Sequence, residues 1–321
     1  MSLRQDSILT PEAETFLAEW TAPTPDITAH TSGSTGTPKE IRLSKADMRA
    51  SAHATIEFFG LNSDSTLALP LSPDYIAGKM QIVRAFEAGC RIVTEKPSSQ
   101  PLATFPYDRC TLVPIVPSQL KGFLGSPVSR HTDNVIIGGA PLAPDQEKEI
   151  AELGISAFAT YGMTETCSHV ALRRIGEETY RALPGMTFST DDRGCLVIDS
   201  STMSFGHLVT NDMVTLEGNT CFRWLGRYDN VINSGGVKIH PEEVEKVLAT
   251  LIPQGATAYV TARTSKRWGE EAVIVTDSHT LGANILERLK EMLPQHTAPR
   301  DIIYLDKIPL TSSGKIIRQK I

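Results

Sequence analysis

The sequence predicts an α/β protein, with a layered α/β and β-rich large domain followed by a small α+β domain. Between residues 66 and 170, short apolar runs alternate with stretches of helical periodicity, which is typical of a mostly parallel sheet covered by helices. After residue 180 the runs are short and turn residues separate them, which indicates a β-rich subdomain. The roughly 90 residues at the C-terminal end combine both patterns, which indicates a second unit.

The first predicted elements flank a loop rich in glycine and hydroxyl-bearing residues. Alternating residues predict strands over 26–30 and 40–43, so residues 31–39 join two strands. Ser44 is a good helix N-cap, Asp47 follows at the third helical position, and Gly60 supplies the stop. Apolar residues at helical spacing between them predict a packed helix of about four turns.

The elements after residue 60 follow from the same periodicities. Strands are predicted over residues 67–69, 91–93, 111–113, 135–137 and 157–159, and helices over 80–88 and 144–153. In the C-terminal unit a helix begins at Pro241, and strands over 256–260, 272–276 and 302–305 and a helix over 285–293 follow. The pattern changes near residues 225–230, so we expect domains over residues 1–227 and 228–321.

Charge and cysteine content exclude several classes of protein. Lys and Arg number 31 and Asp and Glu 37, which gives a net charge of −6 and argues against a nucleic-acid partner. The five cysteines lie far apart in the sequence and predict neither a zinc site nor a disulfide framework. The chain has no apolar run of about 18 residues and no signal-peptide pattern, so we expect a cytoplasmic protein without a membrane partner.

The segment over residues 31–39 has the composition of a phosphate-binding loop. Its glycines expose backbone N–H groups, and its hydroxyls and one ammonium are further donors for an anion. By composition alone, a solvated loop is an equal alternative. It is not the familiar ATPase loop, because Pro38 stands where that motif has Gly and a strand follows. The residues proposed to bind phosphate are Thr31, Ser32, Gly33, Ser34, Thr35, Gly36 and Lys39.

A second polar cluster follows the strand predicted over residues 157–159. Tyr161, Thr164 and Glu165 supply an aromatic ring, a hydroxyl and a carboxylate where an α/β sheet places ligand contacts. Taken alone, this segment could equally be a capped strand end with Tyr161 in the core.

Three weaker features follow in the second half of the chain. Asp212, which follows Asn211 in a predicted turn, and Arg227 have the charges to bind a ribose or a phosphate. The Gly235-Gly236 pair is by default a flexible turn. Lys315, taken alone, is a solvated lysine near the C-terminal end.

Together and in this order, the five segments resemble the adenylate-forming superfamily of acyl-CoA synthetases, adenylation domains and luciferases. The similarity spans residues 30–315. It rests on the Thr-Ser-Gly-Ser-Thr-Gly-Thr-Pro-Lys loop, the Tyr-Gly-Met-Thr-Glu strand end, the Asp212 segment, the Gly-Arg-Tyr-Asp segment that leads through Gly-Gly to Pro-Glu-Glu-Val-Glu, and the final Gly-Lys pair. Residues 161–169, Tyr-Gly-Met-Thr-Glu-Thr-Cys-Ser-His, look closest to the o-succinylbenzoate–CoA ligase branch of menaquinone synthesis.

The resemblance implies a role for each matching residue. The loop over residues 32–39 would bind the β and γ phosphates of ATP, and the small C-terminal domain would be mobile. Thr164 would contact the α-phosphate, Glu165 would hold Mg²⁺, and Lys315 would act in the first half-reaction. The remaining residues implied are Gly138, Gly139, Ala140, Pro141 and Tyr161 around the adenine, Asp212 and Arg227 at the ribose, Asp229 as hinge, and Gly235 and Gly236 along the tunnel for CoA.

The implied activity is that of an ATP-dependent acid–CoA ligase acting through an acyl-adenylate. On o-succinylbenzoate, with ATP and CoA, it would give o-succinylbenzoyl-CoA, AMP and pyrophosphate. The alternatives are another small aryl or acyl acid–CoA ligase, an enzyme that loads a carrier protein, and a catalytically degenerate nucleotide-binding protein. The second carboxylate of o-succinylbenzoate requires a cation. The segment over residues 69–84 offers Tyr75, Lys79 and Arg84, with His169 and Arg173 further on, and Lys79 at a helix start is the first choice.

Two features depart from the superfamily pattern. The superfamily carries well over a hundred residues before its phosphate loop, whereas here the loop begins at Thr31, so we expect a reduced N-terminal region that a partner or a homodimer covers. The superfamily also favours Gly before the ribose-binding Asp, where this chain has Asn211. Asn tolerates positive φ, so the predicted turn can form.

Overall fold

The computed structural model describes residues 2–30, 40–253, 256–279, 281–282, 284–310 and 316–321. Its main feature is an eleven-stranded mixed sheet in the order β10-β11-β12-β13-β9-β8-β7-β6-β5-β3-β4. Strands β4-β3-β5-β6-β7 are parallel, as predicted for this part of the chain. Their bounds are β3 Thr66–Leu69, β4 Arg91–Thr94, β5 Cys110–Ile115, β6 Thr132–Ile137 and β7 Ala157–Gly162.

The strands after β7 form the β-rich part of the large domain that the sequence predicts, and they belong to the same sheet as the parallel strands. Each pairs antiparallel with its neighbour, and β8 pairs with β7, so all of them extend the same sheet. Local hairpin patterns identify the strands but do not show which existing edge they join. The bounds are β8 His169–Arg174, β9 Thr179–Ala182, β10 Met186–Thr190, β11 Cys195–Ser200, β12 His207–Leu216 and β13 Cys221–Arg227.

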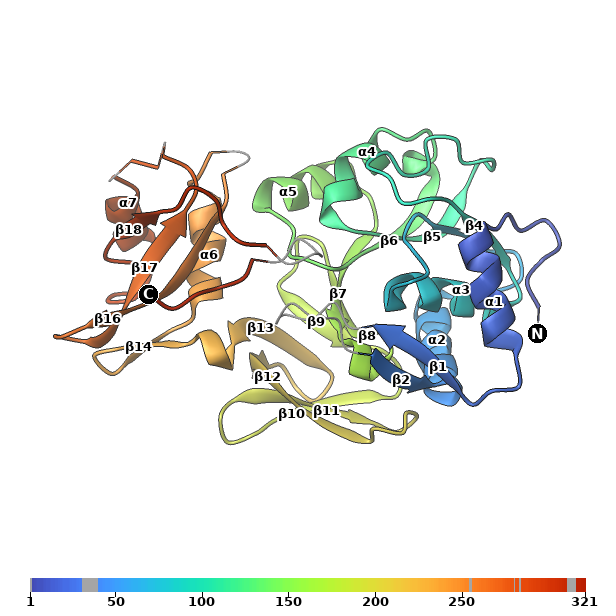
Figure 1. Cartoon of the computed structure of the whole chain (residues 1–321), viewed down its shortest axis with the longest axis horizontal. Coiled ribbons are helices and arrows are strands. Elements are labelled where there is room, and N and C mark those ends of the chain that lie inside the picture. Colours follow the sequence, from blue (N-terminus) through green and yellow to red (C-terminus); the bar gives the residue numbers. More distant parts are fainter. Residues whose placement is uncertain (1, 31–39, 254–255, 280, 283, 311–315) are drawn as a thin grey trace.

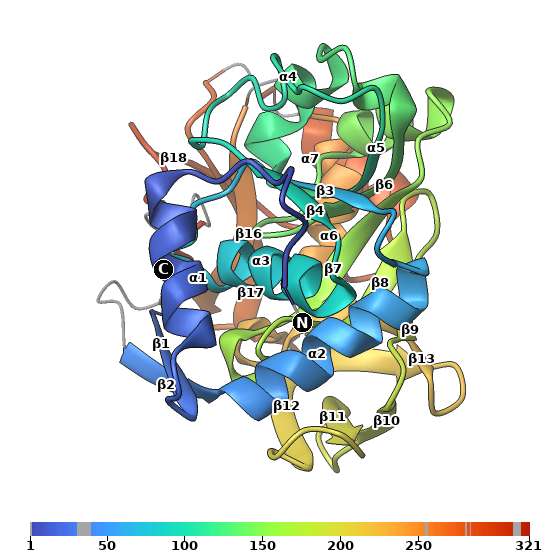
Figure 2. The same ribbon diagram turned by 90° about the vertical axis from the view of Figure 1, so that its right-hand side faces the viewer.

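Helices cover both faces of the parallel part of the sheet (Figures 1 and 2). Leu67 and Leu69 on β3 pack with residues of α2 and α3, whereas Ala68 between them packs with residues of α4 and α5. Successive side chains of a strand point to opposite faces, so the two helix pairs lie on opposite sides. The bounds are α2 Lys45–Phe59, α3 Ile76–Ala88, α4 Leu120–Leu124 and α5 Pro144–Glu152.

The N-terminal elements include one helix that the sequence analysis missed. Helix α1, Pro11–Thr21, begins after the N-cap Thr10 and buries Phe16 and Trp20. The predicted strands on either side of residues 31–39 are confirmed as β1 Asp26–His30 and β2 Glu40–Ser44, which pair antiparallel. The predicted caps of α2 are also confirmed, because Ser44 Oγ accepts from the N–H groups of Ala46 and Asp47, and Gly60 has a φ of 62°.

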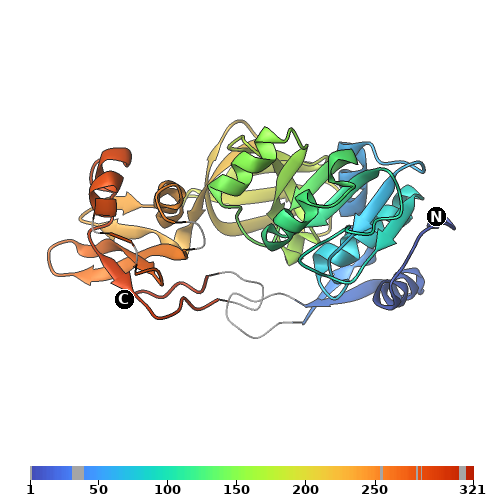
Figure 3. The same cartoon turned by 90° about the horizontal axis from the view of Figure 1, so that it is seen from above.

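The C-terminal elements form a separate lobe around a five-stranded sheet (Figure 3). Strands β15, β14, β17 and β16 are antiparallel, and β18 pairs parallel with β17. The proposed division at residues 227 and 228 falls where the chain leaves the large sheet. The bounds are β14 Ile232–Ser234, β15 Val237–Ile239, α6 Pro241–Ala249, β16 Ala258–Ser265, β17 Gly269–Thr276, α7 Asn284–Met292 and β18 Ile302–Tyr304.

Short 3-10 helices complete the fold at Pro117–Gln119, Ser129–His131, Thr164–Thr166 and Tyr228–Asn230. In the part of the chain that the structure describes, none of the helices has the length and apolar character needed to cross a membrane.

Candidate active site

The Asp212 carboxylate is the centre of the candidate site. Its two oxygens accept from the hydroxyl of Tyr161, at 2.8 Å, and from Nε1 of Trp224, at 3.1 Å. Burial and the adjacent carboxylate raise the pKa of Tyr161, so its hydroxyl keeps the proton that it donates. Asp212 is only 7% exposed, and these two donors fix its orientation. Trp224 has no motif around it, and the sequence analysis did not find it.

The prediction of a turn at Asn211 and Asp212 is wrong. Both residues lie within β12, Asp212 pairs with Arg227 on β13, and the register shifts between Met213 and Val214. Asn211 is not among the described residues with positive φ. A bulge changes the direction in which the side chains of a strand point, so Asp212 can be oriented without a turn.

The expected ribose and hinge residues lie together. Nη1 of Arg227 is 3.9 Å from an Asp212 oxygen, and its Nη2 is 3.4 Å from an Asp229 oxygen. The Asn211 side chain donates to the same Asp229 oxygen at 3.3 Å, and its own oxygen accepts from Arg193 at 2.9 Å. The structure therefore brings together Tyr161, Asp212, Arg227 and Asp229 from segments up to 68 residues apart.

The predicted Mg²⁺ ligand lies just beyond β7. Thr164 and Glu165 form the 3-10 helix Thr164–Thr166, which leaves the Glu165 carboxylate exposed. The described residues contain no group of three His, Cys, Asp or Glu side chains that could hold a metal. Mg²⁺ commonly binds one or two carboxylates together with substrate phosphates, and a single exposed Glu165 fits that mode.

Glycines bring the loop after β6 against the end of β7. A Cβ at Gly138 would lie 2.7 Å from Oγ1 of Thr160, the residue before Tyr161, and Gly139 has a φ of 89°. A side chain at Gly138 would push the loop away from β7, and one at Gly139 would be strained by the positive φ. Ala140 and Pro141 follow in the same loop, so all four predicted adenine contacts lie at the edge where Tyr161 lies.

The predicted CoA residues form a tight turn in the C-terminal lobe. Gly235 and Gly236 join β14 to β15 with φ of 59° and 89°, and the N–H of Gly235 donates to the Trp268 carbonyl at 2.8 Å. A Cβ at Gly235 would lie 2.6 Å from the Trp268 ring. The guanidinium groups of Arg267 and Arg300 lie 4.6 and 4.9 Å from the centre of that ring.

Two groups of predicted residues cannot be placed. Lys315 and the phosphate loop lie outside the described residues, so their roles remain predictions. The loop residues concerned are Thr31, Ser32, Gly33, Ser34, Thr35, Gly36 and Lys39.

The residues predicted to contact the acid have different surroundings. Tyr75 is exposed and precedes α3. The Lys79 ammonium lies 4.5 Å from the centre of the Phe16 ring and 4.0 Å from a Glu19 carboxylate oxygen, so it faces α1. Arg173 makes a 2.6 Å ion pair with Glu147. His169 is buried and shares hydrogen bonds with Thr55 and Ser168.

Arg84 has the surroundings of an anion-binding residue. It is 1% exposed and donates to Ser168 Oγ at 2.7 Å and to Gln81 Oε1 at 3.4 Å. Its Nε has no acceptor among the residues that the structure describes. Among the described residues it makes no ion pair with a carboxylate. Burial lowers the pKa of Arg84 to about 9, so the guanidinium is charged at neutral pH. A buried charge without a counter-charge is costly, and an anionic ligand group would compensate it.

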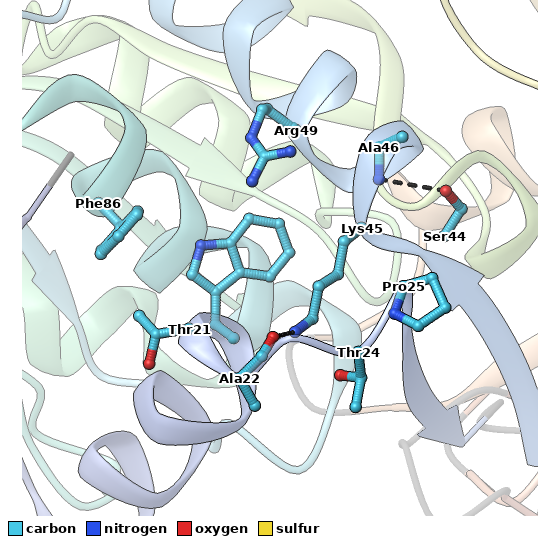
Figure 4. A pocket seen from close by; sticks show the side chains of 10 residues that line it. Thr21, Ala22, Thr24, Pro25, Ser44, Lys45, Ala46, Arg49 and Phe86 are labelled. Atoms are coloured by element: carbon cyan, nitrogen blue, oxygen red, sulfur yellow. Dashed lines mark hydrogen bonds between the residues drawn. The ribbon is translucent and has the colours of Figure 1, made fainter.

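An open groove of about 660 Å³ lies elsewhere, between the end of α1 and the start of α2 (Figure 4). The Lys45 ammonium points to the end of α1, where it donates to the carbonyls of Glu19 and Ala22 at 2.8 and 2.7 Å. Arg49 pairs with Glu87 at 3.0 Å. Both cations thus have partners within the protein, and the groove includes none of the residues that surround Asp212.

Comparison with known proteins identifies the family. The sequence profile described as AMP-binding enzyme matches residues 17–205, more than half of the chain. The chain belongs to the AMP-binding enzyme family. The predicted membership of this adenylate-forming group is therefore confirmed.

The curated relatives of this AMP-binding enzyme are CoA ligases. Indoleacetate–CoA ligase of Aromatoleum aromaticum is 28% identical, over 91% of this chain and 66% of that protein. The 2-succinylbenzoate–CoA ligase of Enterococcus faecalis is 26% identical, over 91% of this chain and 68% of that protein. The chain thus spans about two thirds of the length of the curated relatives it matches.

Solved structures confirm the predicted fold of this AMP-binding enzyme. An acyl-CoA synthetase (AMP-forming)/AMP-acid ligase II-like protein from Dyadobacter fermentans is 31% identical, with a TM-score of 0.67 over 97% of this chain and 94% of that chain. An o-succinylbenzoate CoA synthetase from Bacillus subtilis, in complex with ATP and magnesium ion, gives a TM-score of 0.79 at 24% identity, over 91% of this chain and 68% of that chain.

One contact links the large sheet to the C-terminal lobe and can be tested. Gly226 on β13 has a φ of 144°, and a Cβ there would lie 2.9 Å from Cδ of Glu242 on α6. Gly226→Ala is expected to lower the free energy of unfolding by roughly 2 kcal/mol and to reduce cooperativity between the two lobes, as measured by urea denaturation.

The matched control for this variant is Gly218→Ala. Gly218 also has a positive φ, 81°, but no atom lies within 4 Å of its Cβ position. The control therefore measures backbone strain alone. Equal losses in the two variants would show that the approach of Glu242 contributes nothing.

Proposed function

We propose that this protein is an AMP-forming acid–CoA ligase that acts through an acyl-adenylate, with o-succinylbenzoate as the acid. The observation that carries the substrate is the buried Arg84, whose guanidinium reaches Ser168, three residues after Glu165. O-succinylbenzoate keeps a second carboxylate after the first is activated, and this carboxylate needs a buried cation. A relative named 2-succinylbenzoate–CoA ligase is consistent with this choice.

In the first half-reaction the acid's carboxylate attacks the α-phosphorus and pyrophosphate leaves. A carboxylate is already ionised at neutral pH, so the site needs no general base. Asp212 and Arg227 would bind the ribose hydroxyls, and Tyr161 would hold Asp212 in place through its 2.8 Å hydrogen bond. Lys315 and the loop over residues 31–39 would stabilise the charge that develops on the phosphates. Mg²⁺, held by Glu165, would supply additional positive charge at the phosphates.

In the second half-reaction the thiol of CoA would replace AMP on the acyl group. Rotation about Asp229 would bring Gly235 and Gly236 to the site as the thiol channel. Two guanidinium groups beside Trp268 favour CoA over a protein-bound pantetheine, because only free CoA carries a phosphorylated nucleotide that such cations and a ring can bind.

The proposal is tested with a panel of acids, each assayed with ATP, Mg²⁺ and CoA for thioester and AMP. The panel contains o-succinylbenzoate, benzoate, indoleacetate and a fatty acid. We expect stoichiometric AMP and thioester with o-succinylbenzoate and weak turnover of the monocarboxylates. Activity on indoleacetate or benzoate without activity on o-succinylbenzoate would overturn the substrate, and no acid-dependent pyrophosphate exchange with any acid would overturn the activity.

The cation that binds the acid can be identified by mutation. Arg84→Gln is expected to raise the KM for o-succinylbenzoate at least about 10-fold, the 1.5–3 kcal/mol of a charge-assisted contact, and to leave the KM for ATP unchanged. Lys79→Ala serves as the comparison, because the Lys79 ammonium faces Phe16 and Glu19. A raised acid KM in Lys79→Ala alone would restore Lys79 as the residue that binds this carboxylate.

A further inference from the structure

A line of hydrogen bonds runs from α2 to Arg84, the residue that we propose binds the acid. Nη2 of Arg84 lies 2.7 Å from Ser168 Oγ, and Ser168 Oγ lies 3.3 Å from Nδ1 of His169. The other ring nitrogen of His169, Nε2, lies 3.1 Å from Oγ1 of Thr55. The Thr55 hydroxyl in turn donates to the Ser51 carbonyl at 3.2 Å.

The two ends of this line determine the direction of most of its bonds. A guanidinium only donates and a carbonyl only accepts. Ser168 Oγ therefore accepts from Arg84, which leaves its hydrogen for Nδ1 of His169. Thr55 gives its hydrogen to Ser51, so its oxygen accepts from Nε2 of His169. The line thus places a hydrogen on Nε2 of His169, and a neutral ring completes it by accepting from Ser168 at Nδ1.

The surroundings of His169 favour this neutral form. The ring is buried, and burial together with the nearby Arg84 charge lowers its pKa well below the usual value. On α3, Gln81 accepts from Arg84, and its amide donates to the carbonyls of Ala68 and Leu112 at 3.2 and 3.1 Å. Two of the three nitrogens of the Arg84 guanidinium are therefore held, and the third, Nε, has no acceptor in the described part of the chain.

We propose that His169 is a positioning residue, which through Ser168 fixes the orientation of the Arg84 guanidinium for the carboxylate of the acid. The catalytic relevance of this orientation rests on the proposed function. The role differs from the direct substrate contact expected from the sequence, because both ring nitrogens of His169 already have partners within the protein. A buried guanidinium with several rotamers would bind the carboxylate less well, since ordering it would then cost conformational entropy on binding.

The first test uses the protein without substrate. Nitrogen NMR of histidine-labelled protein at pH 7 should show His169 with a protonated Nε2 and an unprotonated Nδ1, assigned by the loss of its signals in His169→Phe. In arginine-labelled protein, a sharp Nε–H signal of Arg84 should broaden or disappear in His169→Phe. A protonated Nδ1, an imidazolium, or an unchanged Arg84 signal would overturn the proposal. These outcomes do not depend on the acid being o-succinylbenzoate.

The second test separates positioning from folding by kinetics. His169→Phe and Ser168→Ala should raise the KM for the best acid of the panel about 10-fold, with kcat and the KM for ATP within about twofold. His169→Asn, whose amide oxygen can accept from Ser168, should recover most of the loss. Ser126→Ala is the matched control, because Ser126 Oγ is buried and has no hydrogen-bond partner among the described residues. Equal acid KM values in wild type, His169→Phe and Ser168→Ala, with each protein folded, would show that the line does not position Arg84.

Discussion

Replacing Lys315 with alanine is expected to slow formation of the acyl-adenylate by roughly 10²–10³, or about 3–4 kcal/mol. The lysine is proposed to stabilise negative charge as pyrophosphate leaves, and that charge is largest in the transition state of this step. In the second half-reaction the charge is no longer present. Thioester formation from supplied acyl-adenylate should therefore proceed at nearly the wild-type rate.

Pyrophosphate exchange and a single-turnover measurement of adenylate formation test the first half-reaction, and thioester formation from isolated adenylate tests the second. Lys307→Ala, an exposed lysine earlier in the same segment, is the control for loss of surface charge. Equal losses in both half-reactions of Lys315→Ala would contradict a role for Lys315 in the first half-reaction alone. A normal first half-reaction would remove Lys315 from the site.

Replacing Asp212 with alanine is expected to weaken ATP binding about 100-fold, because two hydrogen bonds from ribose hydroxyls to a carboxylate would be lost. The variant also leaves the Tyr161 hydroxyl and Trp224 Nε1 without their acceptor. The KM for the acid should change little, since Arg84 lies on a different element. Asp199→Ala on the neighbouring strand β11, where the carboxylate contacts His207 on the surface, is the control.

A nucleotide without one ribose hydroxyl shows whether Asp212 acts directly. In the wild-type protein, deoxy-ATP should bind more weakly than ATP. In Asp212→Ala the two nucleotides should bind nearly equally, because the acceptor that distinguishes them is absent. Persistent discrimination in the variant would assign the ribose to other residues.

The fold was predicted best where local signals decide it. Ser44 and Gly60 end a helix by interactions within a few residues of the chain, and the structure has α2 between them. Short apolar runs between stretches of helical periodicity likewise predicted the parallel strands β3 to β7 and their order in the sequence. Helix α1 was missed because its burial depends on helices that lie further along the chain. Phe16 contacts Lys79 of α3, and Trp20 contacts Lys45 and Arg49 of α2.

The candidate site was predicted in its motifs and only partly in its geometry. The sequence identified Tyr161, Asp212 and Arg227, but placed Asp212 in a turn. The structure shows a bulged strand instead, because the pairing of β12 with β13 depends on residues that the local pattern around Asp212 does not contain. Trp224, the second donor to Asp212, lies 12 residues away and belongs to no motif.

The sequence by itself determined the family, the order of the elements and the kinds of side chain that the site can use. Only the tertiary structure decided that Arg84 is buried without a counter-charge from the described residues. Lys79 and Arg84 lie five residues apart on α3, and the helix turns by 3.6 residues per turn, so the two side chains point to different neighbours. Lys79 meets Phe16 and Glu19 of α1, whereas Arg84 meets Ser168 beside the Tyr-Gly-Met-Thr-Glu segment. These partners are brought together by long-range packing, which the local sequence does not encode.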